Sequence, residues 1–290
     1  MASIDVSTGM TLEYDIRGEG EPILFVMGLG GQLIDFREEF VDLFVAEGYQ
    51  AIRFDNRDIG LSTHTDWEPP SQRRTIASMI TRRPLSGAGY TVEDMAADGA
   101  ALLEALGIDA AHVVGVSMGG MITQAMAINH PSKVKSICSI MSNTGDRKHG
   151  GIAMSLIRQF IRRPEPTIEN FVDSSVFTFS AISGEHFDEE EHRKQAAESL
   201  ARGFVPAGVA RQTAAIGASP DRTARLRQVR VPALVIHGLA DPLVKPSGGI
   251  ATAKAIPGSR LLMFGDMGHD LPVPRWPEIV DAIIRNIRRA

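Results

Sequence analysis

A serine between two glycines is the most informative chemical feature of this sequence. Residues 112–121 read HVVGVSMGGM, so Ser117 follows a run of apolar, strand-forming residues and precedes a helix-like pattern. The spacing Gly-x-Ser-x-Gly is typical of a nucleophile at the tip of a tight strand-to-helix turn, where a Cβ at Gly115 or Gly119 would crowd the backbone. Five residues alone also fit an ordinary turn with a serine N-cap. The choice depends on the rest of the chain.

A serine nucleophile needs a general base, and the base needs a carboxylate to orient it. Asp241 and His269 each follow an apolar run that predicts a strand, VPALVIHG and LLMFGDMG respectively. Because Ser117 also follows a predicted strand, all three residues are expected at the carboxyl edge of one parallel sheet. The order Ser, Asp, His along the chain is that of one hydrolase fold. We therefore predict these three residues as a catalytic triad.

Other acids near these positions are rivals for the orienting role. Asp146, just past a further predicted strand, is the main alternative to Asp241. Asp266 and Asp270 flank His269, and their closeness in sequence makes the required geometry harder to reach than from another strand. We therefore favour Asp241.

A glycine-rich loop, Met27–Gly31, follows the predicted strand 22–26 and reads MGLGG. Its glycines let the backbone approach a substrate closely. The N–H groups of Leu29 and Met118 are the candidate donors of an oxyanion hole, the second of them at a helix N-terminus. Dinucleotide binding is the competing interpretation. It fails because Leu33 stands where G-x-G-x-x-G needs its third glycine.

The elements that must position these residues alternate between short apolar strands and longer helical patterns. This alternation predicts an α/β fold with a mostly parallel sheet and helices on both faces. The expected strands cover 22–26, 50–54, 112–116, 134–141, 231–237 and 259–264, and the expected helices cover 91–106, 117–130 and 276–288.

Two segments break this alternation. Residues 62–90 are rich in Pro, Arg and Ser, and residues 142–221 contain helical patterns but no clear strand pair. We predict residues 1–141 and 222–290 as an α/β core, and 142–221 as a helical cap over the carboxyl edge of its sheet. The alternative for the insertion is a set of ordinary peripheral helices.

Composition narrows the class of protein. The chain has 290 residues, of which 43% are hydrophobic and 22% charged, as in a globular domain. Its formal net charge of −5 and the lack of a Lys/Arg block argue against a nucleic-acid partner. Cys138, the single cysteine, and His237, at a strand end, are assigned to packing. Without a secretory pattern or an apolar run of about 18 residues, we expect no membrane span and a cytoplasmic location.

Five motifs make the chain resemble the α/β-hydrolases over nearly its whole length. Within that superfamily it is similar to the esterases that resemble aclacinomycin methylesterase and to mycobacterial lipase/esterase-like hydrolases. The resemblance implies an eight-stranded sheet and a helical cap after the sixth strand, and neither a cofactor nor a metal ion is expected. The motifs are MGLGG at 27–31, FDNRDIGLS at 54–62, GVSMGG at 115–120, VIHGLAD at 235–241 and DMGH at 266–269.

The resemblance also shapes the expected substrate. Many members carry His-Gly where this chain has Met27-Gly28, a change that keeps the backbone donor and makes the pocket mouth more apolar. Dehalogenases and epoxide hydrolases of this fold carry Asp at the position of Ser117, which argues against both activities. Together with Phe177 and Phe179, the Met-Gly pair is predicted to line the substrate pocket. We predict a carboxylesterase-type hydrolase acting on small to medium, largely apolar acyl groups.

Alternatives of two classes stay open at this point. The same triad performs C–C bond hydrolysis, thioester cleavage and peracid formation. Some members of the fold are non-catalytic receptors that bind a small ligand in the same cleft. A small-molecule ester is the expected partner, and the assembly is expected to be a monomer or a homodimer.

Overall fold

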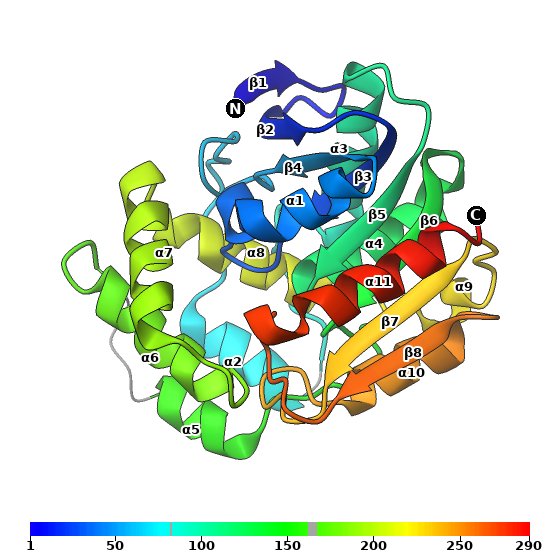
Figure 1. Ribbon diagram of the computed structural model, residues 1–290. Coiled ribbons are helices and arrows are strands. Elements are labelled where there is room, and N and C mark those ends of the chain that lie inside the picture. The colour runs from blue at the N-terminus through cyan, green and yellow to red at the C-terminus, as the bar shows by residue number, and fades with distance from the viewer. Residues whose placement is uncertain (82, 162–166) are drawn as a thin grey trace.

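The computed structural model describes residues 1–81, 83–161 and 167–290. These residues contain one eight-stranded sheet flanked by helices (Figure 1). The strand order is β1-β2-β4-β3-β5-β6-β7-β8, in which β2 pairs antiparallel with β1 and β4 and the other neighbouring strands pair in parallel. The mostly parallel, eight-stranded sheet is therefore confirmed. The strands are β1 (Ala2–Asp5), β2 (Thr11–Arg17), β3 (Glu21–Val26), β4 (Tyr49–Phe54), β5 (Ala111–Val116), β6 (Val134–Ile140), β7 (Ala233–Gly238) and β8 (Arg260–Phe264).

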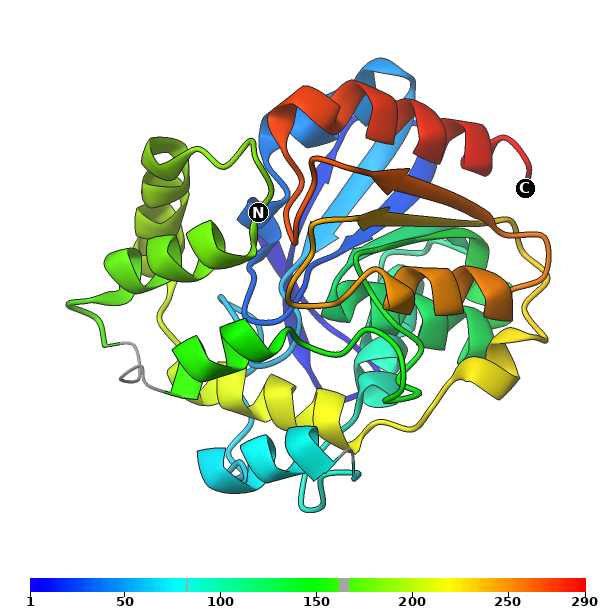
Figure 2. The ribbon, with the colours of Figure 1, turned by 90° about the horizontal axis from the view of Figure 1, so that it is seen from below.

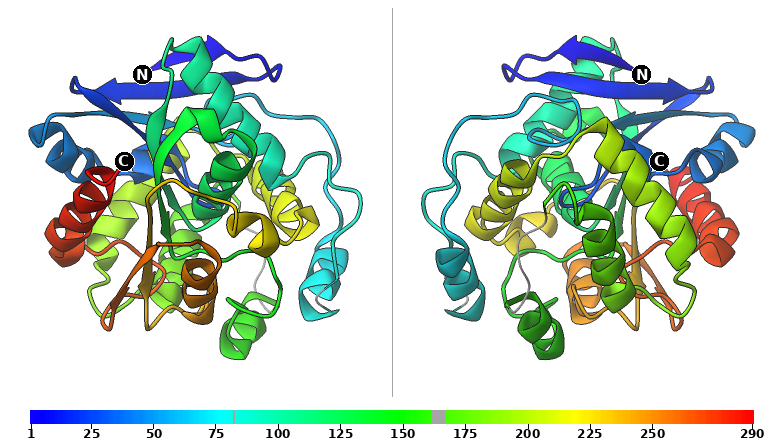
Figure 3. Two further views of the ribbon diagram at one scale, coloured as in Figure 1. Left: turned by 90° about the vertical axis from the view of Figure 1, so that its right-hand side faces the viewer. Right: turned by 90° about the vertical axis from the view of Figure 1, so that its left-hand side faces the viewer.

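Helices cover both faces of this sheet, as the edge-on views of Figure 3 show for α1 and α11 on one side and α3 and α4 on the other. The predicted strands and helices agree with the observed bounds within two residues. The helices are α1 (Glu38–Ala46), α2 (Gln72–Thr81), α3 (Val92–Ala105), α4 (Met118–Asn129), α5 (Met154–Ile161), α6 (Phe171–Ile182), α7 (Glu189–Arg202), α8 (Pro206–Ala218), α9 (Thr223–Leu226), α10 (Ser247–Ala255) and α11 (Trp276–Ile287).

Two apolar cores lie between the sheet and its helices. On one face Phe25 of β3 packs edge-on against Phe36 and Phe44, and α11 completes this layer. On the other face α3 and α4 contribute a second cluster that includes Met95 and Ile122. Burial from both sides explains why the interior strands β5 and β7 are buried at every position and are mostly apolar in sequence.

The hairpin of β1 and β2 was not predicted from the residues. It lies at one edge of the sheet (Figure 3), where β2 is covered only in part. Its sequence TLEYDIR alternates charged and apolar residues instead of forming an apolar run. A partly exposed strand near the edge of the sheet therefore carries a weaker sequence signal than a strand buried on both faces.

The inserted segment 142–221 lies between β6 and β7 and forms helices α5 to α8 within its described part. Residues 162–166 of the predicted cap lie outside the described residues. Figures 1 and 2 show α5, α6 and α7 grouped to one side of the sheet, beyond the end toward which β7 points. In the described residues, no helix is both long and apolar enough to cross a membrane.

Candidate active site

Ser117 occupies the turn between β5 and α4 with φ +56°, a conformation that non-glycine residues rarely adopt. The flanking glycines allow this turn. A Cβ at Gly119 would lie 1.9 Å from the carbonyl oxygen of Val26, and one at Gly115 would lie 2.1 Å from that of Gly119. The predicted crowding is thus confirmed, and the turn leaves Ser117 half-buried just past the carboxyl end of β5.

Three side chains that follow the carboxyl ends of β5, β7 and β8 form a chain of hydrogen bonds. His269 Nε2 lies 3.0 Å from Ser117 Oγ, and His269 Nδ1 lies 2.7 Å from Asp241 Oδ2. His269 and Asp241 are buried. The structure therefore brings together the three residues that the sequence singled out for nucleophile, base and orienting acid.

The Asp241 carboxylate has further hydrogen-bond partners besides His269. Its Oδ1 accepts hydrogen bonds from the N–H groups of Leu243 and Val244, at 2.9 and 2.8 Å. His237, fully buried, places Nε2 2.7 Å from the Val244 carbonyl oxygen and 3.4 Å from Asp241 Oδ2. Burial acts to raise the pKa of Asp241, but hydrogen bonds from His237 and His269 outweigh it and hold that pKa below its ordinary value. Sequence reasoning missed this contact of His237.

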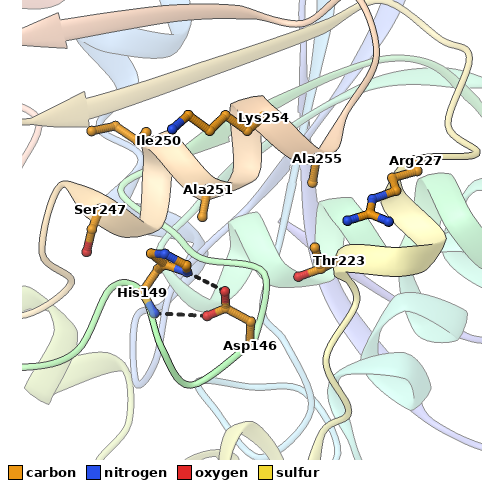
Figure 4. A pocket seen from close by; sticks show the side chains of 9 residues that line it. All are labelled: Asp146, His149, Thr223, Arg227, Ser247, Ile250, Ala251, Lys254 and Ala255. Carbon is orange, nitrogen blue, oxygen red and sulfur yellow. Dashed lines mark hydrogen bonds and ion pairs between the residues drawn. The ribbon is translucent and has the colours of Figure 1, made fainter.

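Asp146, the rival acid, lies elsewhere. It lines a cavity of about 260 Å³ between α9 and α10, where Figure 4 shows it beside His149. Its Oδ2 lies 2.5 Å from His149 Nδ1, and its Oδ1 accepts from the N–H of the same residue. Asp146 is thus engaged by another histidine, whereas His269 pairs with Asp241.

The loop that carries His269 is bound to the end of α6. The His269 N–H donates to the Ile182 carbonyl at 2.7 Å, and Asp270 Oδ1 accepts from the N–H groups of Gly184 and Gly268. Burial raises the pKa of Asp270, although these backbone donors oppose the shift. The carboxylate of Asp270 therefore ties the inserted helices to the histidine loop and does not contact the imidazole nitrogens.

Asp266, the other flanking acid, belongs to an ion-pair cluster. It accepts from Arg275 Nη2 at 2.7 Å and faces His186 Nε2 at 2.8 Å. Glu185, His186 and Asp266 have ligand-type atoms within 4.8 Å of one another, but the carboxylate of Asp266 is already paired with a guanidinium. We therefore interpret the cluster as a surface salt bridge and not as a metal site.

The Asp266 cluster predicts a pH-dependent contribution to stability. Arg275 first and His186 second lower the pKa of Asp266 to about 2, below the value of about 4 for an unfolded aspartate. Between those values the unfolded chain binds more protons, so the contribution is full above pH 4 and is lost as the pH falls toward 2. Urea unfolding of wild type and Asp266→Asn should show a stability difference that shrinks below pH 4. A difference independent of pH from 6 to 3 would contradict this assignment.

The glycine-rich loop after β3 lies against Ser117. A Cβ at Gly28 would lie 3.2 Å from Ser117 Cβ, so the absence of a side chain at this position lets the loop pass close to Ser117. Within the described residues, the N–H of Leu29 has no hydrogen-bond acceptor. Met118 is the first residue of α4, where the N–H has no acceptor within the helix. Two backbone donors are therefore available next to Ser117.

The predicted pocket residues have different surroundings. Met27 is buried, and its side chain packs beneath Gly31. Phe177 and Phe179 lie on α6 and are 46% and 37% exposed, and the Phe179 ring centroid lies 4.2 Å from that of His192 on α7. Both phenylalanines thus present apolar surface on the inserted helices.

Comparison with known proteins places this geometry in a family. A family model of the alpha/beta hydrolase fold matches residues 21–273. The chain is 27% identical to rhodomycin D methylesterase of Streptomyces peucetius, with 93% of this chain and 91% of that protein aligned. It is 31% identical to a Mycobacterium tuberculosis protein that carries the provisional name of a non-heme bromoperoxidase, with 90% and 91% aligned.

A solved structure agrees with these relatives. The enol-lactonase of Burkholderia xenovorans LB400 superposes with a TM-score of 0.76 at 21% identity, over 99% of this chain and 100% of that one. At this identity the likeness shows a shared fold. The family model covers most of the chain, and the sheet, the elbow and the strand-end residues all agree with it. The chain belongs to the α/β-hydrolase fold family.

Proposed function

We propose that this protein is a serine hydrolase of carboxylic esters, with Ser117 as nucleophile, His269 as general base and Asp241 as the orienting acid. The observation that carries the proposal is the chain of hydrogen bonds from Ser117 Oγ through His269 to Asp241. The long alignment with a methylesterase supports esters as the substrate class.

The hydrogen-bond geometry supports a proton path from Ser117 to His269. The Asp241 carboxylate has no proton to give, so His269 Nδ1 donates to it and the lone pair of Nε2 faces Ser117 Oγ at 3.0 Å. As Oγ attacks the ester carbonyl, its proton passes to Nε2, and the imidazolium is stabilised by the carboxylate. His269 then protonates the leaving alkoxide, which yields an acyl-enzyme and an alcohol. Water attacks the acyl carbonyl by the same route and restores the serine.

The oxyanion formed in each attack needs donors that are already in place. We assign this role to the N–H groups of Leu29 and Met118, on the two backbone segments that meet at Ser117. Donors of this kind stabilise developing charge without reorganising, and loss of one costs roughly 10²- to 10³-fold in kcat.

We further propose that residues 142–221 act as a cap on a core made of 1–141 and 222–290, and that the space between them accepts an apolar acyl group. Six apolar side chains that are 37–54% exposed support this site. Three lie in loops that follow the carboxyl ends of strands, and three lie on the inserted helices. They are Leu29, Leu61, Leu239, Phe177, Phe179 and Val209.

An acyl-chain series of p-nitrophenyl esters tests the proposed substrate class. The value of kcat/KM is expected to rise from acetate to butyrate by up to roughly fourfold per buried methylene, because each contributes about 0.8 kcal/mol. For palmitate, the value of kcat/KM should be lower again. The matched control is the p-nitrophenyl monoester of succinate, whose charged acyl group should be hydrolysed more slowly than butyrate. A flat profile, or a preference for succinate, would contradict an apolar acyl site.

Assays with other substrates separate the alternative activities of this fold. Turnover of a ring-cleavage diketone without ester hydrolysis would favour C–C bond hydrolysis, and preference for a thioester would favour a thioesterase. Peracid formation from acetate and hydrogen peroxide would favour a perhydrolase. Binding of such compounds without any turnover would favour a receptor.

A further inference from the structure

The peptide that carries the Leu29 N–H has a defined direction. The carbonyl of Gly28, in the same peptide unit, accepts a hydrogen bond from the Gly31 N–H at 3.2 Å. The peptide bonds described are trans, so carbonyl and N–H point in opposite directions. The Leu29 N–H therefore points away from Gly31.

Two side-chain amides hold the neighbouring peptide units. Asn56 Nδ2 donates to the Met27 carbonyl at 3.0 Å, on the side before the Leu29 N–H. On the side after it, the Gly30 N–H donates to Gln212 Oε1 at 2.9 Å. Gly30 has φ +73°, where a glycine is free to take other conformations if its partner is removed. The Gly28–Leu29 peptide thus lies between two peptide units that are each held by a side-chain amide. We call each of these two contacts a clamp, and the second one comes from α8.

Gln212 is well placed to act as a clamp. Its side chain is fully buried, and Nε2 donates to the Arg57 carbonyl at 2.9 Å while Oε1 accepts from Gly30. Both ends of the amide are therefore satisfied, which fixes its orientation. The amide joins the loop after β3 to the loop after β4.

The helix that carries Gln212 is itself anchored to the core. The neighbouring Arg211 forms a buried ion pair with Asp58 at 3.2 Å and donates to the Trp67 carbonyl at 2.8 Å. Val209, one turn earlier, has a methyl carbon 3.3 Å from where a Cβ of Gly30 would stand. Contacts of α8 with the Gly30 region are thus both polar and apolar.

We propose that Gln212 is a positioning residue for the oxyanion hole, so that the proposed cap completes the site through α8. The inference rests on the proposed function. When α8 is seated, Gln212 fixes the Leu29–Gly30 peptide and thereby the direction of the Leu29 N–H. When the contact is lost, the glycine-rich loop has other conformations in which that N–H no longer faces the substrate.

Three variants test this role. Gln212→Leu removes the acceptor and is expected to lower kcat by about 10- to 100-fold with little change in KM, since misplacement by about 1 Å costs up to roughly 10²-fold. Gln212→Glu retains an oxygen for the Gly30 N–H and should recover part of kcat. Ser219→Ala is the matched control, because it removes a buried contact of the same helix, from the Val92 N–H, away from the loop. It should leave kcat unchanged.

Two further readouts distinguish positioning from a general loss of stability. Amide exchange at Gly30 should quicken in Gln212→Leu and not in Ser219→Ala. A boronic acid that forms a tetrahedral adduct on serine should bind Gln212→Leu more weakly by the same factor as the loss in kcat. Equal kcat losses in the leucine variant and the control, or unchanged exchange at Gly30, would overturn the proposal. Wild type without Ser117-dependent turnover would instead refute the proposed function, while the exchange measurement would still test the clamp.

Discussion

Replacing Ser117 with alanine is expected to lower kcat for p-nitrophenyl butyrate by about 10⁴-fold or more. The hydroxyl is the only group of this side chain that can attack the ester, and His269 Nε2 has no other proton to accept in the first step. The fold should persist, since Ala at φ +56° carries the same backbone strain as Ser. Steady-state kinetics and thermal unfolding of the purified variant measure both effects.

A buried serine on the neighbouring strand end provides the control. Ser142 is 1% exposed, and its hydroxyl has no hydrogen-bond partner among the residues that the structure describes, so Ser142→Ala should retain both activity and stability. Phenylmethylsulfonyl fluoride should add one sulfonyl group to wild type, on Ser117, and none to Ser117→Ala. Turnover that survives in Ser117→Ala, or labelling at another residue, would refute Ser117 as the nucleophile.

Replacing Asp241 with asparagine is expected to lower kcat by about 10⁴-fold while KM changes little. The cause is the tautomer of the imidazole. Leu243 and Val244 both donate N–H groups to Oδ1, so an asparagine would place its oxygen there and turn its NH₂ toward His269. Nδ1 would then have to accept, and the proton would move to Nε2, which could no longer take the proton of Ser117.

Asp146→Asn is the matched control for this prediction, because it makes the same chemical change in the rival acid. Asp146 pairs with His149 in the cavity beside α10, so the variant should keep kcat within about twofold of wild type. Parallel kinetics of the two variants measure this contrast. A large loss in Asp146→Asn with a small one in Asp241→Asn would reverse the assignment of the acid.

The features that follow from the residues alone are those that depend on local chemistry. The glycines beside Ser117 follow from the space that a strand-to-helix turn allows, and the long apolar runs of β5 and β7 follow from burial on both faces. Strand ends of a parallel sheet meet at one edge, so residues after three strands could be predicted to lie together. Strand β2, next to the edge strand β1, is only partly buried and has no such run, so the residues alone do not predict it.

The contact partners of each side chain depend on how distant elements pack together in the tertiary structure. Asp241 and Asp146 both follow strands, and their separation into different sites depends on loop paths that no local pattern encodes. Packing was predicted for His237, but its contact with Asp241 was not. Gln212 meets Gly30 across 182 residues of sequence. No local sequence pattern predicts these contacts, because their geometry is set by packing between distant elements and not by residue type.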